Sequence, residues 1–411
     1  MKLSDIRCET LCYFFFVSQS YTVFYTELHS LIISNMNQVS REFQVFIKPA
    51  GPECNLHCRY CYYLDKADRF PGEIHFRMSD DLLEKYIIQL MEATTGGPVF
   101  FAWHGGEPLL AGLGFFRKAV KLQRKHLPSG QTLMNGIQTN GTLLNEDWCA
   151  FLAEERFMVG ISIDGPEEQH NSFRKDGAGK GTFEKVIKGY ELLVKHGIIP
   201  EILCVVHAEN VGFPLEIYRF FKSLGAKFMT FLPLVVRLPG SPEGVTPDSV
   251  PPEAFGRFLM TVFDEWVEQD IGNVKIQIFE EALRTAFNQD HTLCIFKKEC
   301  GGVPVVEYNG DFYSCDHFVD QVHLLGNIRN NSLTWYLDHP VQKAFGTAKW
   351  STLPDYCLNC EVLAMCNGEC PKNRFVRTPS DETGLNYLCA GYKMFFNHTR
   401  PFVEAVRQMR L

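Results

Sequence analysis

Three cysteines in one short run carry the clearest chemistry of this chain. They are Cys54, Cys58 and Cys61, spaced C-x3-C-x2-C, and they follow the turn-forming residues Pro49 to Pro52. Three thiolates on one tight loop can hold a cubic iron–sulfur cluster by three of its four irons. The fourth iron then lacks a protein ligand, and an open coordination position is typical of a metal site that binds a reactant. The spacing therefore predicts a cluster that binds a small molecule.

A second group of eight cysteines lies in the last third of the chain, spaced C-x5-C-x14-C and then C-x2-C-x5-C-x3-C-x18-C. Its members are Cys294, Cys300, Cys315, Cys357, Cys360, Cys366, Cys370 and Cys389. In a reducing compartment such cysteines usually bind metal and do not pair as disulfides. Two interpretations are open: two iron–sulfur clusters with four cysteines each, or a zinc site at the closely spaced cysteines.

The elements that must position these cysteines alternate between strand-like and helix-like patterns. Strands are expected at 44–47, 99–103, 134–138, 158–163, 201–206 and 228–232. Amphipathic helices are expected between them, at 80–93, 115–126, 146–155 and 182–196. Because parallel strands need a crossover helix, this alternation predicts a parallel α/β sheet. Six units are two short of a closed eight-stranded barrel, so we expect a partial (β/α)6 barrel.

Short polar motifs follow the first four expected strands. The cysteine loop follows the first strand, His104-Gly-Gly-Glu-Pro108 the second and Gln138-Thr-Asn-Gly141 the third, while Ser162-Ile-Asp-Gly-Pro166 closes the fourth. Any one of them is compatible with a plain turn, since Gly-Gly, Asn-Gly and Gly-Pro are common in turns. Function in α/β folds gathers at the carboxyl ends of the strands. Four motifs at the same end therefore predict a ligand pocket.

The chain divides into four expected segments. Residues 1–35 are an N-terminal extension of uncertain role, with Met36 as an alternative start, and 36–236 form the partial barrel. Residues 237–290 are a linker with helices, and 291–400 form the cysteine-rich domain.

Bulk properties exclude some partners. The net charge of −8, without a basic block, argues against binding to nucleic acid. No apolar run approaches the ~20 residues that span a bilayer, and no secretory signal is recognisable, so we expect no membrane partner and a cytoplasmic location.

Several motifs resemble the radical SAM superfamily, namely the cysteine loop with the following Tyr62-Tyr63 and Gly105-Gly-Glu-Pro108. The C-terminal cysteine pattern resembles the SPASM module. Within that group the chain is most similar to anaerobic sulfatase-maturating enzymes, over about 43–392, through the motifs Cys315-Asp-His-Phe318, Leu325-Gly-Asn327, Gly368-Glu-Cys-Pro-Lys372 and Asn386-Tyr387. The resemblance implies an enzyme that oxidises a Cys or Ser side chain of a sulfatase to Cα-formylglycine. A 5′-deoxyadenosyl radical would abstract a hydrogen atom from Cβ.

The resemblance also implies three 4Fe–4S clusters and S-adenosylmethionine as cofactors. Cys54, Cys58 and Cys61 would hold the cluster that binds S-adenosylmethionine. One auxiliary cluster would be bound by Cys294, Cys300, Cys315 and Cys370, and the other by Cys357, Cys360, Cys366 and Cys389. Spacing alone would place Cys370 with its three sequence neighbours.

The implied contacts to S-adenosylmethionine come from residues of the motifs at the strand ends. The adenine would be contacted by Tyr60, through its ring or its backbone, and lined by Leu203. The methionyl amino group would be contacted by Gly105, Gly106 and Glu107. The methionyl carboxylate and the ribose would be contacted by Ser162 and Arg174. For Leu203 the alternative is plain sheet core. Tyr63 would touch the peptide substrate, and His104 stands where some relatives carry Gln.

Asp316 occupies the position of the family's proposed general base, directly after Cys315. We expect partial burial to raise its pKa. The alternative is a turn cap near Asn309-Gly-Asp311. The implied partners are a sulfatase with a Cys/Ser-x-Pro-x-Arg motif and a flavodoxin or ferredoxin as electron donor. Two other hypotheses are a different SPASM peptide-modifying enzyme, such as a thioether-forming one, and a non-catalytic electron carrier or zinc module.

Overall fold

The computed structural model describes residues 42–63, 66 and 76–409. The predicted N-terminal extension and the alternative start at Met36 lie outside these residues. Within them, no helix is both long and apolar enough to cross a membrane.

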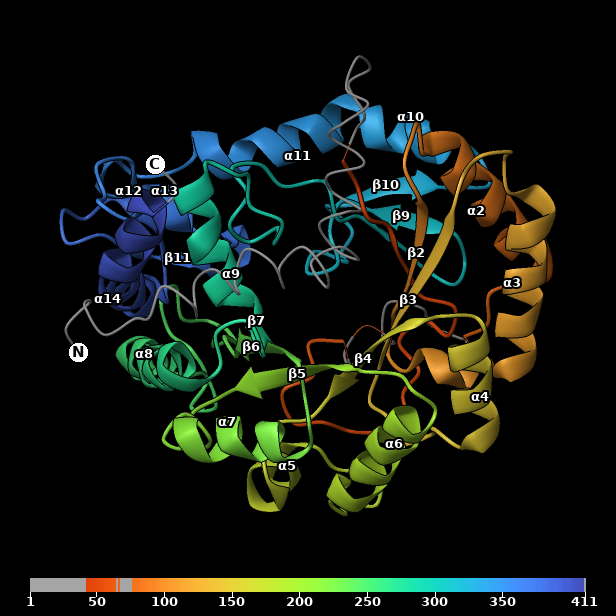
Figure 1. Ribbon diagram of the computed structural model, residues 1–411. Coiled ribbons are helices and arrows are strands. Elements are labelled where there is room, and N and C mark those ends of the chain that lie inside the picture. The colour runs from red at the N-terminus through yellow and green to blue at the C-terminus, as the bar shows by residue number, and fades with distance from the viewer. Residues whose placement is uncertain (1–41, 64–65, 67–75, 410–411) are drawn as a thin grey trace.

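A ten-stranded sheet forms the centre of the molecule, in the order β10-β9-β8-β1-β2-β3-β4-β5-β6-β7. The first seven strands are β1 Phe46–Ile47, β2 Val99–Trp103, β3 Leu133–Thr139, β4 Met158–Ser162, β5 Glu201–Val206, β6 Phe228–Pro233 and β7 Lys275–Ile276. They pair in parallel throughout. Figure 1 shows them curving around an open centre, with helices on the outside. The predicted partial barrel is confirmed, and β7 extends it by a strand that the sequence did not indicate.

Helices connect the strands of the barrel and cover its outer side (Figure 1). They are α2 Asp80–Ala93, η3 Pro108–Ala111, α3 Leu113–His126, α4 Glu146–Glu154, α5 Glu167–Phe173, α6 Phe183–Lys195, α7 Pro214–Ser223 and α8 Pro252–Gln269. After β7 the chain continues with α9 Gln277–Arg284 and η4 Thr285–Phe287. The four crossover helices predicted from periodicity are α2, α3, α4 and α6, with ends within two residues of those expected. Helices α5 and α7 were not predicted from the sequence.

The two faces of the barrel strands differ in burial. In β5, Ile202 and Cys204 are fully buried in the main hydrophobic core, whereas Leu203 between them is partly exposed. In β4, Ile161 is fully buried and the neighbouring Ser162 is not. Because side chains alternate along a strand, one face packs under the helices and the other faces the centre of the barrel. Ligand-binding residues are therefore expected on the second face.

The C-terminal part of the chain adds strands to the same sheet. Its elements are β8 Val305–Val306, β9 Asp311–Tyr313, β10 Leu324–Asn327, α10 Leu333–Asp338, α11 Pro340–Ser351, α12 Asp355–Leu358, α13 Leu363–Cys366, η5 Pro371–Asn373, β11 Arg374–Arg377, β12 Thr383–Asn386 and α14 Cys389–Gln408. Strand β8 pairs in parallel with β1, and β9 and β10 continue as antiparallel strands. The cysteine-rich region therefore continues the barrel sheet at the edge that carries the cysteine loop.

Candidate active site

The cysteine loop packs backbone to backbone against the turn after β2. The Gly106 amide donates to the Gly51 carbonyl (2.9 Å), and the Glu107 amide donates to the Glu53 carbonyl (2.8 Å). A Cβ atom on Gly106 would lie only 2.2 Å from the Glu53 carbonyl oxygen. Glycine is therefore required where the two loops meet, because any side chain would force them apart.

Within the part of the chain that the structure describes, none of the three loop cysteines forms a disulfide. Burial raises the pKa of Cys54 to about 12 and that of Cys58 to about 11, and the neighbouring thiols add to both shifts. A bound iron cluster would supply the positive charge that stabilises such thiolates. Among the described residues no three His, Cys, Asp or Glu side chains are placed to share one metal ion. A cubic cluster offers each thiolate its own iron, so its ligands need not meet at one point.

The turns after β2 and β3 are joined through Glu107. Its fully buried carboxylate accepts hydrogen bonds from the Thr139 hydroxyl (2.7 Å) and from the amides of Asn140 (2.8 Å) and Leu109 (3.1 Å). Burial raises its pKa to about 7. The backbone amide and carbonyl of Glu107 are also hydrogen-bonded, to Glu53 and Leu110. The contact of Glu107 with the methionyl amino group stays a prediction.

Arg174 and Tyr60 meet at Asp164, which the sequence analysis did not single out. The Arg174 guanidinium donates to both carboxylate oxygens of Asp164 (2.8 and 3.2 Å), and the Tyr60 hydroxyl donates to one of them (2.5 Å). The Val205 amide donates to the same carboxylate (2.9 Å). The Tyr60 ring stacks on Phe173, with centroids 5.6 Å apart. Of the two predicted modes for Tyr60, backbone contact with the adenine is therefore the one that its position favours.

Ser162 and Leu203 lie side by side on the inner face of the barrel. They are register partners in the pairing of β4 with β5. The Gln138 amide donates to the Ser162 hydroxyl (3.1 Å), and a Cβ atom on Gly160 would lie 2.0 Å from the Gln138 side-chain oxygen. For Leu203, its place on the partly exposed inner face supports the ligand-lining role over the alternative of sheet core.

Asp316 lies beside the cysteine loop, although it is far away in sequence. Its buried carboxylate forms an ion pair with the ammonium of Lys48 and accepts a hydrogen bond from the Tyr62 hydroxyl. Lys48 is fully buried and directly follows β1. The alternative role as a turn cap is not seen, since Asn309 and Asp311 close that turn through their own side chains.

The expectation that the pKa of Asp316 is raised is wrong. Burial does raise it, but the Lys48 ammonium, together with His104 and His317, outweighs burial and holds the pKa well below its usual range. The cause is the ion pair with Lys48, which the sequence could not reveal. Asp316 is therefore an ionised hydrogen-bond acceptor in the folded protein.

The two tyrosines that follow Cys61, Tyr62 and Tyr63, bind different carboxylates. Tyr63 is buried and its hydroxyl donates to the buried carboxylate of Glu307. Its contact with a peptide substrate stays a prediction. Tyr62 is 42% exposed and carries the hydroxyl that binds Asp316. His104 is half-buried beside this group. Its ring stacks on Phe46 at 4.9 Å, and loss of solvation lowers its pKa to about 4.

The structure brings the eight C-terminal cysteines into two neighbourhoods. The thiol of Cys315 interacts electrostatically with those of Cys294 and Cys300, and Cys370 interacts with Cys315. In the second neighbourhood Cys366 interacts with Cys357 and Cys389, and Cys389 also interacts with Cys360. The grouping agrees with the arrangement that the resemblance implied, including the interleaved Cys370. The ligand assignments themselves stay predictions.

Two cations, the buried Lys349 and the half-buried Arg374, lie beside these neighbourhoods. Lys349, on α11, donates from its ammonium to the carbonyls of Cys294 (2.9 Å) and Ile295 (2.8 Å). The guanidinium of Arg374 donates to four carbonyls, among them those of Gly368 and Glu369. Such cations would offset the negative charge of a thiolate-bound cluster.

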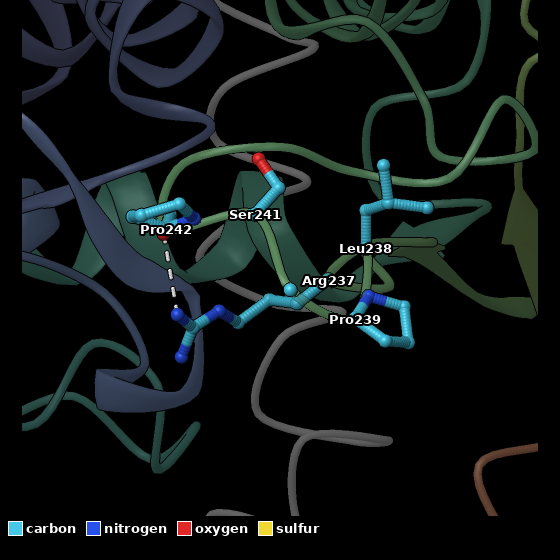
Figure 2. Close-up of a pocket in the computed structure, with 6 residues that line it drawn as sticks. Arg237, Leu238, Pro239, Ser241 and Pro242 are labelled. Atoms are coloured by element: carbon cyan, nitrogen blue, oxygen red, sulfur yellow. Dashed lines mark hydrogen bonds between the residues drawn. The ribbon is translucent and has the colours of Figure 1, made fainter.

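An open pocket lies on the loop after β6 and contains none of the predicted site residues. Figure 2 shows its lining, residues 237–242, with the Arg237 guanidinium donating to the Pro242 carbonyl (3.2 Å). The same guanidinium covers the ring of Phe375 on β11, 4.9 Å from its centroid. These contacts hold the loop in place.

Comparison with known proteins identifies the class. The Radical SAM superfamily model matches residues 49–220, and the model described as an iron–sulfur cluster-binding domain (SPASM) matches residues 294–361. A structure of Streptococcus suis SuiB bound to S-adenosylmethionine has a TM-score of 0.60 and 16% identity, covering 90% of this chain and 82% of that chain, which is a likeness of fold alone. The chain is a radical SAM enzyme with a C-terminal SPASM domain.

Proteins of higher sequence identity show which family within this class the chain belongs to. The serine-type anaerobic sulfatase-maturating enzyme of Bacteroides thetaiotaomicron is 44% identical over 382 residues, covering 90% of this chain and 92% of the relative. The cysteine-type enzyme of Clostridium perfringens strain 13 is 36% identical over 359 residues, covering 87% and 96%. The structure of native anSMEcpe with bound AdoMet and Cp18Cys peptide has a TM-score of 0.80 at 34% identity, covering 89% and 99%.

The chain therefore belongs to the family of anaerobic sulfatase-maturating enzymes. Its cofactors are S-adenosylmethionine and iron–sulfur clusters.

Proposed function

We propose that the protein oxidises a serine or cysteine side chain in a sulfatase polypeptide to Cα-formylglycine. The observation that carries the proposal is the position of Asp316, which is buried next to Cys315 and hydrogen-bonded to Tyr62 of the cysteine loop. A carboxylate at the end of that loop can accept a hydrogen bond from a substrate hydroxyl or thiol, and hydrogen-bond reach is the first requirement of a general base. A serine target is supported by the 44% identity to a relative named serine-type.

The reaction requires one hydrogen atom, one proton and one electron to leave the substrate. A serine CH2–OH that loses all three becomes an aldehyde; a cysteine becomes a thioaldehyde, which water converts to the aldehyde with release of hydrogen sulfide. S-adenosylmethionine with its cluster supplies the radical that takes the hydrogen atom, and three 4Fe–4S clusters in all would supply and accept the electrons.

In this proposal the chain's own residues bind and orient the reactants. Cys54, Cys58 and Cys61 hold one cluster, and the eight C-terminal cysteines hold two more in the sets described above. The backbone of Tyr60 and the residues Gly105, Gly106 and Glu107, together with Ser162, Arg174 and Leu203, would surround S-adenosylmethionine. Arg174 suits this place because the Asp164 carboxylate, which Tyr60 also binds, fixes its guanidinium. The partners would be a sulfatase with a Cys/Ser-x-Pro-x-Arg motif and a flavodoxin or ferredoxin.

The test uses holoenzyme reconstituted anaerobically, with S-adenosylmethionine, a strong reductant and two peptides that differ only in Ser or Cys at the motif. Mass spectrometry should detect the aldehyde, with 5′-deoxyadenosine formed alongside. Cys54→Ala should abolish 5′-deoxyadenosine formation. Deoxyadenosine without aldehyde on either peptide would refute sulfatase maturation and favour another peptide-modifying reaction.

A further inference from the structure

Lys48 is the charged residue of the site to which the proposed reaction gives no role. Its side chain is 0% exposed, six residues before Cys54. Lysine is almost never fully buried unless its charge is paired. Removing an ammonium from water costs several kcal/mol, which a well-placed partner must offset. The position of Lys48 therefore needs a specific explanation.

Two donors share the carboxylate of Asp316. The Lys48 ammonium is paired with Oδ1, and the Tyr62 hydroxyl donates to Oδ2. One donor comes from the end of β1 and the other from the cysteine loop. A carboxylate that is held at both oxygens by different elements keeps one orientation, because rotation about Cβ–Cγ would break both contacts.

Lys48 is itself held in place from several directions. Its ammonium lies 3.3 Å from the centroid of the Tyr63 ring, a close cation–π contact. The Tyr63 hydroxyl is in turn bound by Glu307, which is 0% exposed. The Lys48 amide donates to the Val306 carbonyl (3.0 Å), where β1 meets β8. The ammonium therefore occupies one position relative to Asp316.

Among the described residues, several buried polar atoms around this group have no hydrogen-bond partner. They are Nδ1 of His104, Nδ1 of His317 and Oε2 of Glu307, besides the ion-paired Lys48 Nζ and Asp316 Oδ1. Buried polar atoms in native proteins are normally satisfied, so unpaired ones next to an ion pair indicate a place for a polar ligand or water. A substrate hydroxyl or thiol is such a ligand, and Asp316 is the acceptor beside it.

We propose that Lys48 is a positioning residue for the proton-transfer step: its ammonium holds the Asp316 carboxylate in the orientation that accepts the substrate proton. The inference rests on the proposed function, since it assigns Lys48 to the proton-transfer step of the proposed oxidation. Lys48 acts through Asp316 and has no part in radical formation. Its loss should therefore slow proton removal and leave cleavage of S-adenosylmethionine intact.

The experiment measures 5′-deoxyadenosine and aldehyde separately for wild type, Lys48→Met, Asp316→Asn and the double variant. Methionine keeps the length of the side chain and removes its charge. We expect Lys48→Met to form 5′-deoxyadenosine at the wild-type rate and aldehyde about 100-fold more slowly, the typical cost of a misplaced reacting group. Aldehyde formed at the wild-type rate by Lys48→Met would overturn the proposal.

The double variant separates positioning from a merely structural role. If Lys48 acts through Asp316, adding Lys48→Met to Asp316→Asn should cause no further loss of aldehyde. If Lys48→Met slows aldehyde formation in the Asp316→Asn background by the same factor as in the wild-type background, the proposal is overturned. The double variant also keeps the test decisive if Lys48→Met alone fails to fold, because it buries no unpaired charge. Wild-type enzyme that forms no aldehyde from either peptide would refute the proposed function instead.

Discussion

At the scale of single residues, the site consists of buried charges that neutralise one another. Asp164 is fully buried, and Arg174, Tyr60 and the Val205 amide satisfy its carboxylate. Burial alone would raise the pKa of Asp164, but the guanidinium of Arg174 outweighs burial and lowers it. Breaking such a pair leaves one charge buried and uncompensated, which is far more costly than losing a surface salt bridge.

The sequence predicted the residues whose role is read from spacing and missed those whose role depends on burial. The cysteines were found because cluster ligands recur at short intervals. Lys48 and Asp164 were missed because their partners, Asp316 and Arg174, come from other elements. For Lys48 the one available signal was its position at the end of an apolar strand, which indicated that the side chain is buried but not which residue it pairs with.

His170 on α5 provides a pH prediction at this scale. The side chain is 1% exposed, accepts from the Asp164 amide at Nδ1 (3.4 Å) and lies 3.1 Å from the Thr182 hydroxyl. Burial, with Arg174 nearby, lowers its pKa to about 3. Below pH 6.5 the unfolded chain binds a proton at His170 that the folded protein does not. This residue therefore makes stability fall with falling pH, by up to about 1.4 kcal/mol per pH unit.

Denaturant unfolding of the anaerobic holoenzyme at pH 7.5 and pH 5.5 would measure this loss. His170→Asn keeps an acceptor for the Asp164 amide and removes the titrating ring. We expect the variant to lose about 1 kcal/mol less than wild type between the two pH values. An equal loss in both proteins would show that His170 does not titrate in this way.

At the scale of elements, β3, β4 and β5 were located because their buried residues alternate, and β2 and β6 because they are short apolar runs with consecutive buried residues. Strand β8 has only two residues and pairs with β1, more than 250 positions earlier. A strand this short has no period to detect, so its place in the sheet depends on tertiary pairing. Helix α5 was missed for a related reason, since its sequence EEQHNSF is short and mostly polar.

The contact between the cysteine loop and the turn after β2 fixes the position of the loop that would hold the predicted cluster. Gly106→Ala would place a methyl group against the Glu53 carbonyl, 2.2 Å away, where only backbone could yield. Overpacking of this kind costs about 1–3 kcal/mol. We expect the variant to lose stability, and the displaced loop to lose iron and formation of 5′-deoxyadenosine.

Gly114→Ala is the matched control, because a Cβ atom there would meet nothing within 4 Å. Gly114 lies in α3, where alanine favours the helix. Its iron content and activity should equal those of wild type. Wild-type iron content in Gly106→Ala would mean that the loop can shift without affecting the cluster.

At the scale of the whole molecule, the cysteine-rich part is continuous with the barrel. Strands β8 to β10 extend the barrel sheet from β1, and Asp316 thereby reaches the loop of Cys61 and Tyr62. The sequence suggested separate segments because the linker expected at 237–290 interrupts the pattern. The structure shows that segments separated in sequence jointly build the site, which the order of the motifs could not reveal.

A second connection between the two parts is the crossing of α8 and α14. A Cβ atom on Gly391 would lie 2.0 Å from the Pro252 carbonyl, and one on Gly256 would lie 2.7 Å from the Gly391 carbonyl. The two helices therefore touch through backbone. Helix α14 begins at Cys389, a predicted ligand of the second auxiliary cluster. Displacing α14 should move that thiol away from Cys357, Cys360 and Cys366.

Gly391→Ala tests this connection. We expect stability to fall by about 1–3 kcal/mol and iron content to fall by about one third, the share of one cluster in three. Formation of 5′-deoxyadenosine should persist, because the loop from Cys54 to Cys61 lies on the barrel side of the molecule. Aldehyde formation should drop, because the electron from the substrate would lose its path outward. Gly212→Ala, where a Cβ atom has open space, is the control. Unchanged iron in Gly391→Ala would show that Cys389 keeps its place without close helix contact, and the second auxiliary site would then be fixed by its other three cysteines.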